Sequence, residues 1–103
     1  MAQVVPLNWQ GSFLNSGGPL ASGESHFWWA NGGDWGRENR FYLFSVFCDG
    51  SIAADLEVIN VSHFRRMDGP NIFDETHWEV HNKKSDAPVM YYMYMAWSDP
   101  INV

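Results

Sequence analysis

Hydrophobic and polar residues alternate along several short stretches of the chain, and this period of two is the pattern of half-buried β-strands. It is clearest at residues 76–82, where Trp78 and Val80 share one face and three polar side chains share the other. Clusters of Gly, Pro, Asn, Asp and Ser, which favour turns, separate these stretches. No stretch keeps a helical period over two turns. The predicted strands are residues 4–13, 24–30, 39–48, 51–61, 76–82 and 89–98. Residues 62–67 are expected to extend the fourth strand, with a β-bulge as the alternative where His63, Phe64 and Arg65 break the alternation.

Asp49 and Gly50 lie between the third and fourth predicted strands, and an Asp-Gly pair is the strongest short-range signal for a β-hairpin. Both central residues of a type I′ turn need positive φ, which Asp and Gly tolerate. A two-residue turn fixes the register and places Leu43 opposite Leu56. In this register one side of the hairpin, nearly all of it apolar, carries the pairs Phe47–Ile52, Ser45–Ala54, Leu43–Leu56 and Phe41–Val58.

The last predicted strand is apolar on both faces. One face carries Tyr91 and Met93, and the other carries Met90, Tyr92 and Tyr94. A strand of this kind is buried on both sides, so we expect it at the centre of a sheet or at a contact between subunits. Because a large exposed apolar patch usually marks an interface, the strand also predicts a homo-oligomer.

Six to eight short strands separated by turn signals predict an all-β fold, in a single domain of residues 1–103. A compact antiparallel β-sandwich is the expected architecture, and a small β-barrel is the alternative. Cys48 is the only cysteine, so no disulfide forms within one chain and the core alone must stabilise the fold. We interpret Cys48, beside the turn, as a small half-buried residue rather than a nucleophile.

The charge of the chain argues against two classes of partner. Only six Lys and Arg residues are present, and the formal net charge is −6. Nucleic-acid binding requires clustered cations that displace counterions, and the pairs Arg65-Arg66 and Lys83-Lys84 both have acidic neighbours. We therefore expect neither nucleic acid nor an anionic membrane as a partner. No stretch approaches the roughly 18 apolar residues that a membrane span requires.

The sequence has no phosphate-binding loop, dinucleotide fingerprint, Cys-rich metal motif or nucleophile elbow. No catalytic residues and no cofactor are therefore predicted, and we expect a binding protein rather than an enzyme.

A metal site on residues 76–82 is a further hypothesis. His77, Glu79 and His81 project from one strand face, and imidazole and carboxylate groups are zinc ligands. The two histidines lie about 13 Å apart along a straight strand, too far to share one ion, whereas His77 with Glu79 lie close enough. A solvated strand face is the simpler interpretation, so no metal ligand is predicted.

The loop at residues 31–38 is the best candidate for a ligand site. It contains three glycines and Trp35, whose flat ring is suited to stack on the C–H face of a sugar. Binding residues are commonly carried by loops on a rigid scaffold. The alternative is that Trp35 folds back to cap the end of the sandwich, since Trp is highly buried on average. The predicted ligand-binding residues are Asn31, Asp34, Trp35, Arg37 and Glu38.

Two functions compete on these observations. The first is a lectin-like, carbohydrate-binding protein, which should hold Trp35 in an open groove with polar neighbours. The second is a structural or assembly subunit that self-associates through its C-terminal strand, which should place residues 90–97 in a large contact.

Overall fold

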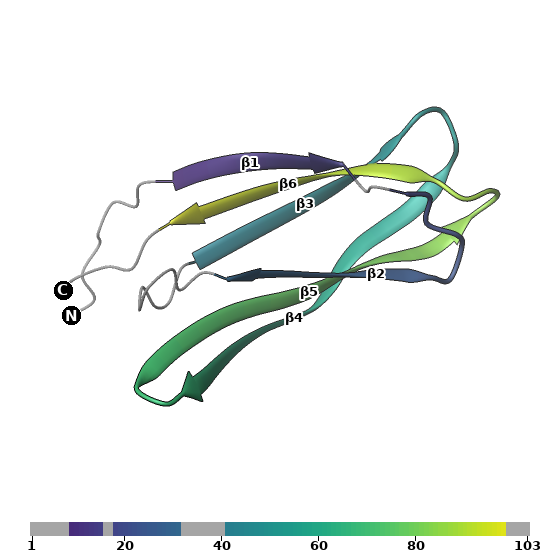
Figure 1. The fold of residues 1–103 in the computed structure, drawn as a ribbon. Coiled ribbons are helices and arrows are strands. Elements are labelled where there is room, and N and C mark those ends of the chain that lie inside the picture. Colours follow the sequence, from purple (N-terminus) through teal and green to yellow (C-terminus); the bar gives the residue numbers. More distant parts are fainter. Residues whose placement is uncertain (1–8, 16–17, 32–40, 99–103) are drawn as a thin grey trace, which may run out of the picture.

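The computed structural model describes residues 9–15, 18–31 and 41–98, which form six antiparallel strands in two three-stranded sheets (Figure 1). In one sheet, β1 (Trp9–Asn15) and β3 (Phe41–Asp49) flank β6 (Met90–Ser98). In the other, β2 (Ser25–Asn31) and β4 (Ala54–Asp68) flank β5 (Asn71–Ser85). The predicted all-β sandwich is confirmed, because the described strands form two separate sheets rather than one closed barrel.

The two longest strands, β4 and β5, form a hairpin whose turn lies at Gly69, as the sequence predicts. Gly69 has a φ of 59°, which glycine adopts without the strain that a Cβ causes. The register shifts between Ile59 and Ser62, and Asn60 has a φ of 52° there. The predicted extension of the strand through residues 62–67 is therefore confirmed, but the β-bulge lies before it, because His63, Phe64 and Arg65 pair in regular register with β5. β5 begins at Asn71, five residues earlier than predicted, and it ends at Ser85.

β3 and β4 do not form the predicted hairpin. β3 pairs with β6 and β4 pairs with β5, so Leu43 lies opposite Ala96 and Leu56 lies opposite Asn82. The chain bends at Gly50, whose φ is 94°, but residues 50–53 then carry it from one sheet to the other. The bend agrees with the Asp-Gly signal, and the predicted pairing is wrong.

The cause of this error lies in β3, which is apolar on both faces. Phe44 and Val46 pack against the core, whereas Leu43 and Phe47 are 60% and 53% exposed. Alternation identifies the core face of a strand only where the opposite face is polar. Because both faces of β3 are apolar, its pattern could not test the register of the predicted hairpin. Pairing with β6 instead joins two strands that are apolar on both faces.

β6 lies at the centre of its sheet, as predicted from its two apolar faces. Tyr91 and Met93 point into the core and are buried, while Met90 and Tyr94 point outward and are exposed. β5 is the central strand of the other sheet, and its alternation is also as predicted. Trp78 and Val80 are buried between the sheets.

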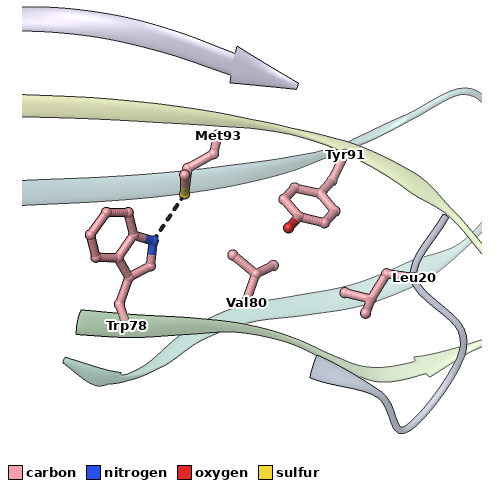
Figure 2. Packing of buried hydrophobic residues seen from close by; sticks show 5 residues of the cluster. All are labelled: Leu20, Trp78, Val80, Tyr91 and Met93. Atoms are coloured by element: carbon pink, nitrogen blue, oxygen red, sulfur yellow. Dashed lines mark hydrogen bonds between the residues drawn. The ribbon is translucent and has the colours of Figure 1, made fainter. Parts of the chain in front are cut away.

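The core joins both sheets through a small cluster that includes Trp78, Val80, Tyr91 and Met93, with Leu20 at one end (Figure 2). All five are at most 2% exposed. The Trp78 indole Nε1 donates a hydrogen bond to the Met93 sulfur at 3.1 Å, which links β5 to β6 across the sandwich. Because burying a large side chain contributes roughly 1.5–3 kcal/mol, these five residues supply much of the apolar stabilisation.

The Tyr91 hydroxyl forms a second link between the sheets. It accepts a hydrogen bond from Trp28 Nε1 at 2.8 Å, and it lies 2.8 Å from His26 Nδ1. Trp28 and His26 both lie on the inner face of β2, as the alternation of that strand predicts. Burial raises the pKa of Tyr91, so its hydroxyl stays protonated at neutral pH.

Cys48 is half-buried beside the bend, in agreement with its interpretation as a small structural residue. Its thiol lies 3.6 Å from the carbonyl oxygens of Asp49 and Ile52, on both sides of the bend.

Candidate functional site

The predicted ligand loop falls largely outside the described residues. Asp34, Trp35, Arg37 and Glu38 belong to residues 32–40, which lie beyond them. Asn31 is the last residue of β2, where its backbone lies opposite Glu75 of β5. Stacking by Trp35 and capping by Trp35 therefore both stay predictions.

Exposed aromatic rings gather instead on the outer surface of the β2–β5–β4 sheet. Because His26, Trp28 and Ala30 point inward, the alternation of β2 turns Phe27 and Trp29 outward. Phe27 is 76% exposed and Trp29 is 64% exposed.

His77 extends this surface across the sheet. Its backbone lies opposite Trp29, so the two outward side chains are cross-strand neighbours. On its other side Phe64 of β4, itself exposed, meets the imidazole edge-on with ring centroids 4.8 Å apart. Phe27, Trp29, His77 and Phe64 thus form one band over three strands, which we call the aromatic face.

A fixed carboxylate borders the aromatic face. Glu75 Oε2 lies 3.1 Å from His77 Nε2, and Arg66 Nε donates to Glu75 Oε1 at 3.1 Å. The hydrogen bond with His77, followed by that with Arg66, holds the pKa of Glu75 below its usual value of 4.5. Glu75 is therefore an ionised acceptor at neutral pH, and its oxygens have further lone pairs to offer a ligand.

Further polar groups lie along the same outer surface. Asn60, at the β-bulge, donates from Nδ2 to Glu79 Oε1 at 3.0 Å, and Glu79 lies opposite Phe27. Ser25 Oγ lies 2.8 Å from His81 Nδ1. Each polar side chain is thus oriented by a neighbour on another strand, which gives the aromatic face a fixed set of donors and acceptors.

His77, Glu79 and His81 do share one face of β5, but they do not converge. His77 pairs with Glu75, and Glu79 pairs with Asn60. Within the described ranges, no three His, Cys, Asp or Glu side chains are grouped so that they could hold a metal ion.

The outer surface of the other sheet is different in character. Residues Gly11, Ala96 and Leu43 form one row across β1, β6 and β3, and Phe13, Tyr94 and Ser45 form the next. Small side chains between larger ones leave an open, mostly apolar hollow of about 640 Å³ over these two rows. We call the outward side chains of these three strands the apolar face; they are Gly11, Phe13, Asn15, Leu43, Ser45, Phe47, Asp49, Met90, Tyr92, Tyr94 and Ala96.

Ring contacts order part of the apolar face. Phe13 stacks on Tyr92 with centroids 5.0 Å apart, and Phe47 meets Tyr94 edge-on at 5.6 Å. The only charged member is Asp49 at the end of β3, and its Oδ2 accepts a hydrogen bond from the Tyr92 hydroxyl at 2.9 Å. Sequence reasoning identified the two-sided apolar character of β6, but not the hollow, which depends on the pairing of β3 with β6.

No protein-family model, curated protein or solved structure matches the chain. No helix long and apolar enough to cross a membrane occurs in the part of the chain that the structure describes.

Proposed function

We propose that the protein is a non-enzymatic carbohydrate-binding protein and that the aromatic face is its binding surface. The observation that carries this proposal is the pair of exposed rings, Phe27 and Trp29, on the outer side of β2. Side chains two residues apart on a strand are separated by roughly 7 Å, so both rings reach one extended ligand. A single exposed ring needs no explanation, whereas adjoining rings on a sheet surface are typical of a binding site.

The chemistry of the aromatic face suits a sugar better than a purely apolar ligand. A pyranose ring has an apolar C–H side that packs on Phe or Trp, and hydroxyls at its rim that require donors and acceptors. Glu75, His77 and Glu79 supply such groups beside the rings. Hydrogen bonds from β4 hold Glu75 and Glu79 in place before the ligand arrives, and Glu75 in turn holds His77 on the same strand, which lowers the entropic cost of binding.

The charge of the chain narrows the class of carbohydrate. The net charge is −6, and Glu75 and Glu79 both lie on this surface. Like charges across an interface are strongly unfavourable, so the expected ligand is a neutral glycan rather than an acidic one.

The first prediction is that Trp29→Ala weakens glycan binding about tenfold or more. A stacked ring contributes about 0.5–1.5 kcal/mol beyond its area, and tenfold in affinity corresponds to about 1.4 kcal/mol. Binding is measured by retention on insoluble cellulose, chitin and mannan and by a glycan array. Because Trp29 is exposed, the substitution should change the unfolding free energy of the protein by no more than about 0.5 kcal/mol.

Phe47→Ala is the matched control for this experiment, because Phe47 is also an exposed ring but lies on the opposite sheet. It should bind glycans as the wild type does. Equal binding by Trp29→Ala and the wild type, or an equal loss in both variants, would show that the aromatic face is not the site.

A second candidate function is assembly, in which the protein is a homo-oligomer that self-associates through its C-terminal strand. The observation that favours it is the exposed outer side of β6, where Met90 and Tyr94 lie beside the hollow of the apolar face. Contiguous apolar surface of this kind commonly marks a protein interface. The mass of the protein in solution tests this proposal, and a single-chain mass across micromolar concentrations would refute it.

A further inference from the structure

We propose that two copies of the chain associate through their apolar faces about a twofold axis, and that this dimer presents its two aromatic faces on opposite sides and bridges separate glycan chains. The dimer deepens the proposed self-association, and the bridging rests on the proposed carbohydrate binding.

The charge distribution favours a second copy as the occupant of the apolar face. Two chains of net charge −6 repel each other over most of their surfaces. On the apolar face the only charge among the described outward positions is Asp49, at the end of β3, where Tyr92 donates a hydrogen bond to it. Association through this face therefore places the fewest like charges in contact.

The shape of the apolar face is suited to contact with itself. Leu43 is 60% exposed and stands beside the hollow over Gly11 and Ala96. In a twofold contact the same patch serves both partners, so a projection of one copy meets a hollow of the other reciprocally. Leu43 of each copy is placed to enter the hollow of its partner.

The size of the face agrees with a reversible dimer. Three strands spaced about 4.8 Å apart, each about seven residues long, cover roughly 15 by 25 Å. Two such faces in contact therefore bury about 800 Å² in total, without the additional area of side chains that project above the sheets. Specific interfaces begin near about 1,000 Å² in total. A dimer that dissociates on dilution, in the micromolar range, is therefore expected.

The order of the sheets in the dimer determines where its two aromatic faces lie. In each copy the aromatic face and the apolar face are the opposite outer sides of the two stacked sheets (Figure 1). Joining two apolar faces makes a stack of four sheets with an aromatic face at each end, about 30 Å apart at about 10 Å per layer. The two sites point away from each other, so they cannot bind the same flat surface together, but they can link two particles or chains.

The test combines two substitutions in the apolar face with one control. Leu43→Lys places two cations in the contact, and because Leu43 is 60% exposed the substitution should leave the fold intact. Gly11→Val fills the hollow, and a Cβ at Gly11 meets only the Met95 carbonyl oxygen at 3.7 Å, an ordinary contact. Val61→Lys is the control, because Val61 is exposed on β4 of the other sheet.

Sedimentation velocity at submillimolar concentration should give twice the mass of one chain for the wild type and Val61→Lys, and this mass should fall toward that of one chain on dilution through the micromolar range. The two apolar-face variants should have the mass of one chain at every concentration. Wild type should also clump cellulose, chitin or mannan particles that it binds, whereas Leu43→Lys should bind them without clumping. A single-chain mass for the wild type at submillimolar concentration, or a dimer unaffected by both variants, overturns the inference.

The two proposals fail in different ways. If the wild type is a dimer that Leu43→Lys dissociates but neither protein binds any polysaccharide, the interface stands and the carbohydrate function with its bridging is wrong. If the wild type is a monomer but Trp29→Ala abolishes binding, the function stands and the dimer is wrong. If the wild type is a monomer and an apolar dye binds in the hollow, the hollow is a small-molecule site and not an interface.

Discussion

Individual hydroxyl and carboxylate groups link strands of this sandwich through hydrogen bonds. Tyr91 is the clearest case, because its hydroxyl bonds two side chains of β2 from the centre of the opposite sheet. Its place on an apolar face of the last strand was predictable from alternation, but not that this face points inward, because both faces of that strand are apolar. Its partners were not predictable, since they depend on which strands face each other.

The second prediction is that Tyr91→Phe lowers the unfolding free energy by roughly 1–3 kcal/mol. The substitution keeps the buried ring but leaves Trp28 Nε1 without its acceptor, and an unsatisfied buried donor costs about this amount. Chemical denaturation measures the change. Tyr94→Phe, at an exposed position, is the control and should change stability by no more than about 0.5 kcal/mol. Equal stability of both variants would show that the Tyr91 hydroxyl does not link the sheets.

The third prediction concerns Glu75 and pH. Its pKa in the folded protein lies below the usual 4.5, so the carboxylate stabilises the fold fully above that value, and this contribution is lost as the pH falls through the lowered pKa. The melting temperature of the wild type should therefore exceed that of Glu75→Gln at neutral pH, and the difference should shrink below about pH 4.5. A difference independent of pH between 3 and 7 would contradict the hydrogen bonds of Glu75 with His77 and Arg66.

At the scale of elements, the strands were more predictable than their partners. The alternation of residues 76–82 and the turn at Gly69 leave local marks in the sequence, whereas the bulge at Asn60 lies before the break in alternation at residues 63–65. The choice between a β3–β4 hairpin and two separate sheets leaves none, because β3 is apolar on both faces. The Asp-Gly pair predicts a bend in the chain. Which strands pair depends on how the apolar faces of all the strands are buried in the whole fold.

The fourth prediction tests the pairing of β3. In a Cys48→Ser background, Leu43→Cys with Ala96→Cys should form a disulfide under mild oxidation, because directly opposed residues have Cα atoms within the distance that a disulfide spans. Leu43→Cys with Leu56→Cys should not, since these residues lie in different sheets. Mass spectrometry of the oxidised proteins reads the result. A disulfide formed only in the variant with Leu43→Cys and Leu56→Cys would support the predicted β3–β4 hairpin instead.

For the molecule as a whole, the sandwich has two chemically different outer surfaces, one for each of the two proposed functions. One carries rings with fixed polar groups, and the other carries rings with almost no charge, so ligand binding and self-association need not compete. The sequence predicted both a carbohydrate ligand and self-association, but it assigned the ligand to the Trp35 loop. Glycines around a Trp are a visible local signal, whereas the aromatic face brings together rings from β2 and β4 with His77 of β5, and only the sheet order makes them neighbours.

The central claim is that a sugar binds over Trp29, and the indole N–H signals in a ¹⁵N-correlated NMR spectrum test it most directly. On titration with a soluble oligosaccharide of the polysaccharide that the protein retains, the Trp29 signal should shift. The signals of Trp28 and Trp78, whose indoles donate to Tyr91 and Met93 inside the sandwich, should stay in place. A shift confined to Trp35, with Trp29 unchanged, would contradict the claim and return the site to the loop.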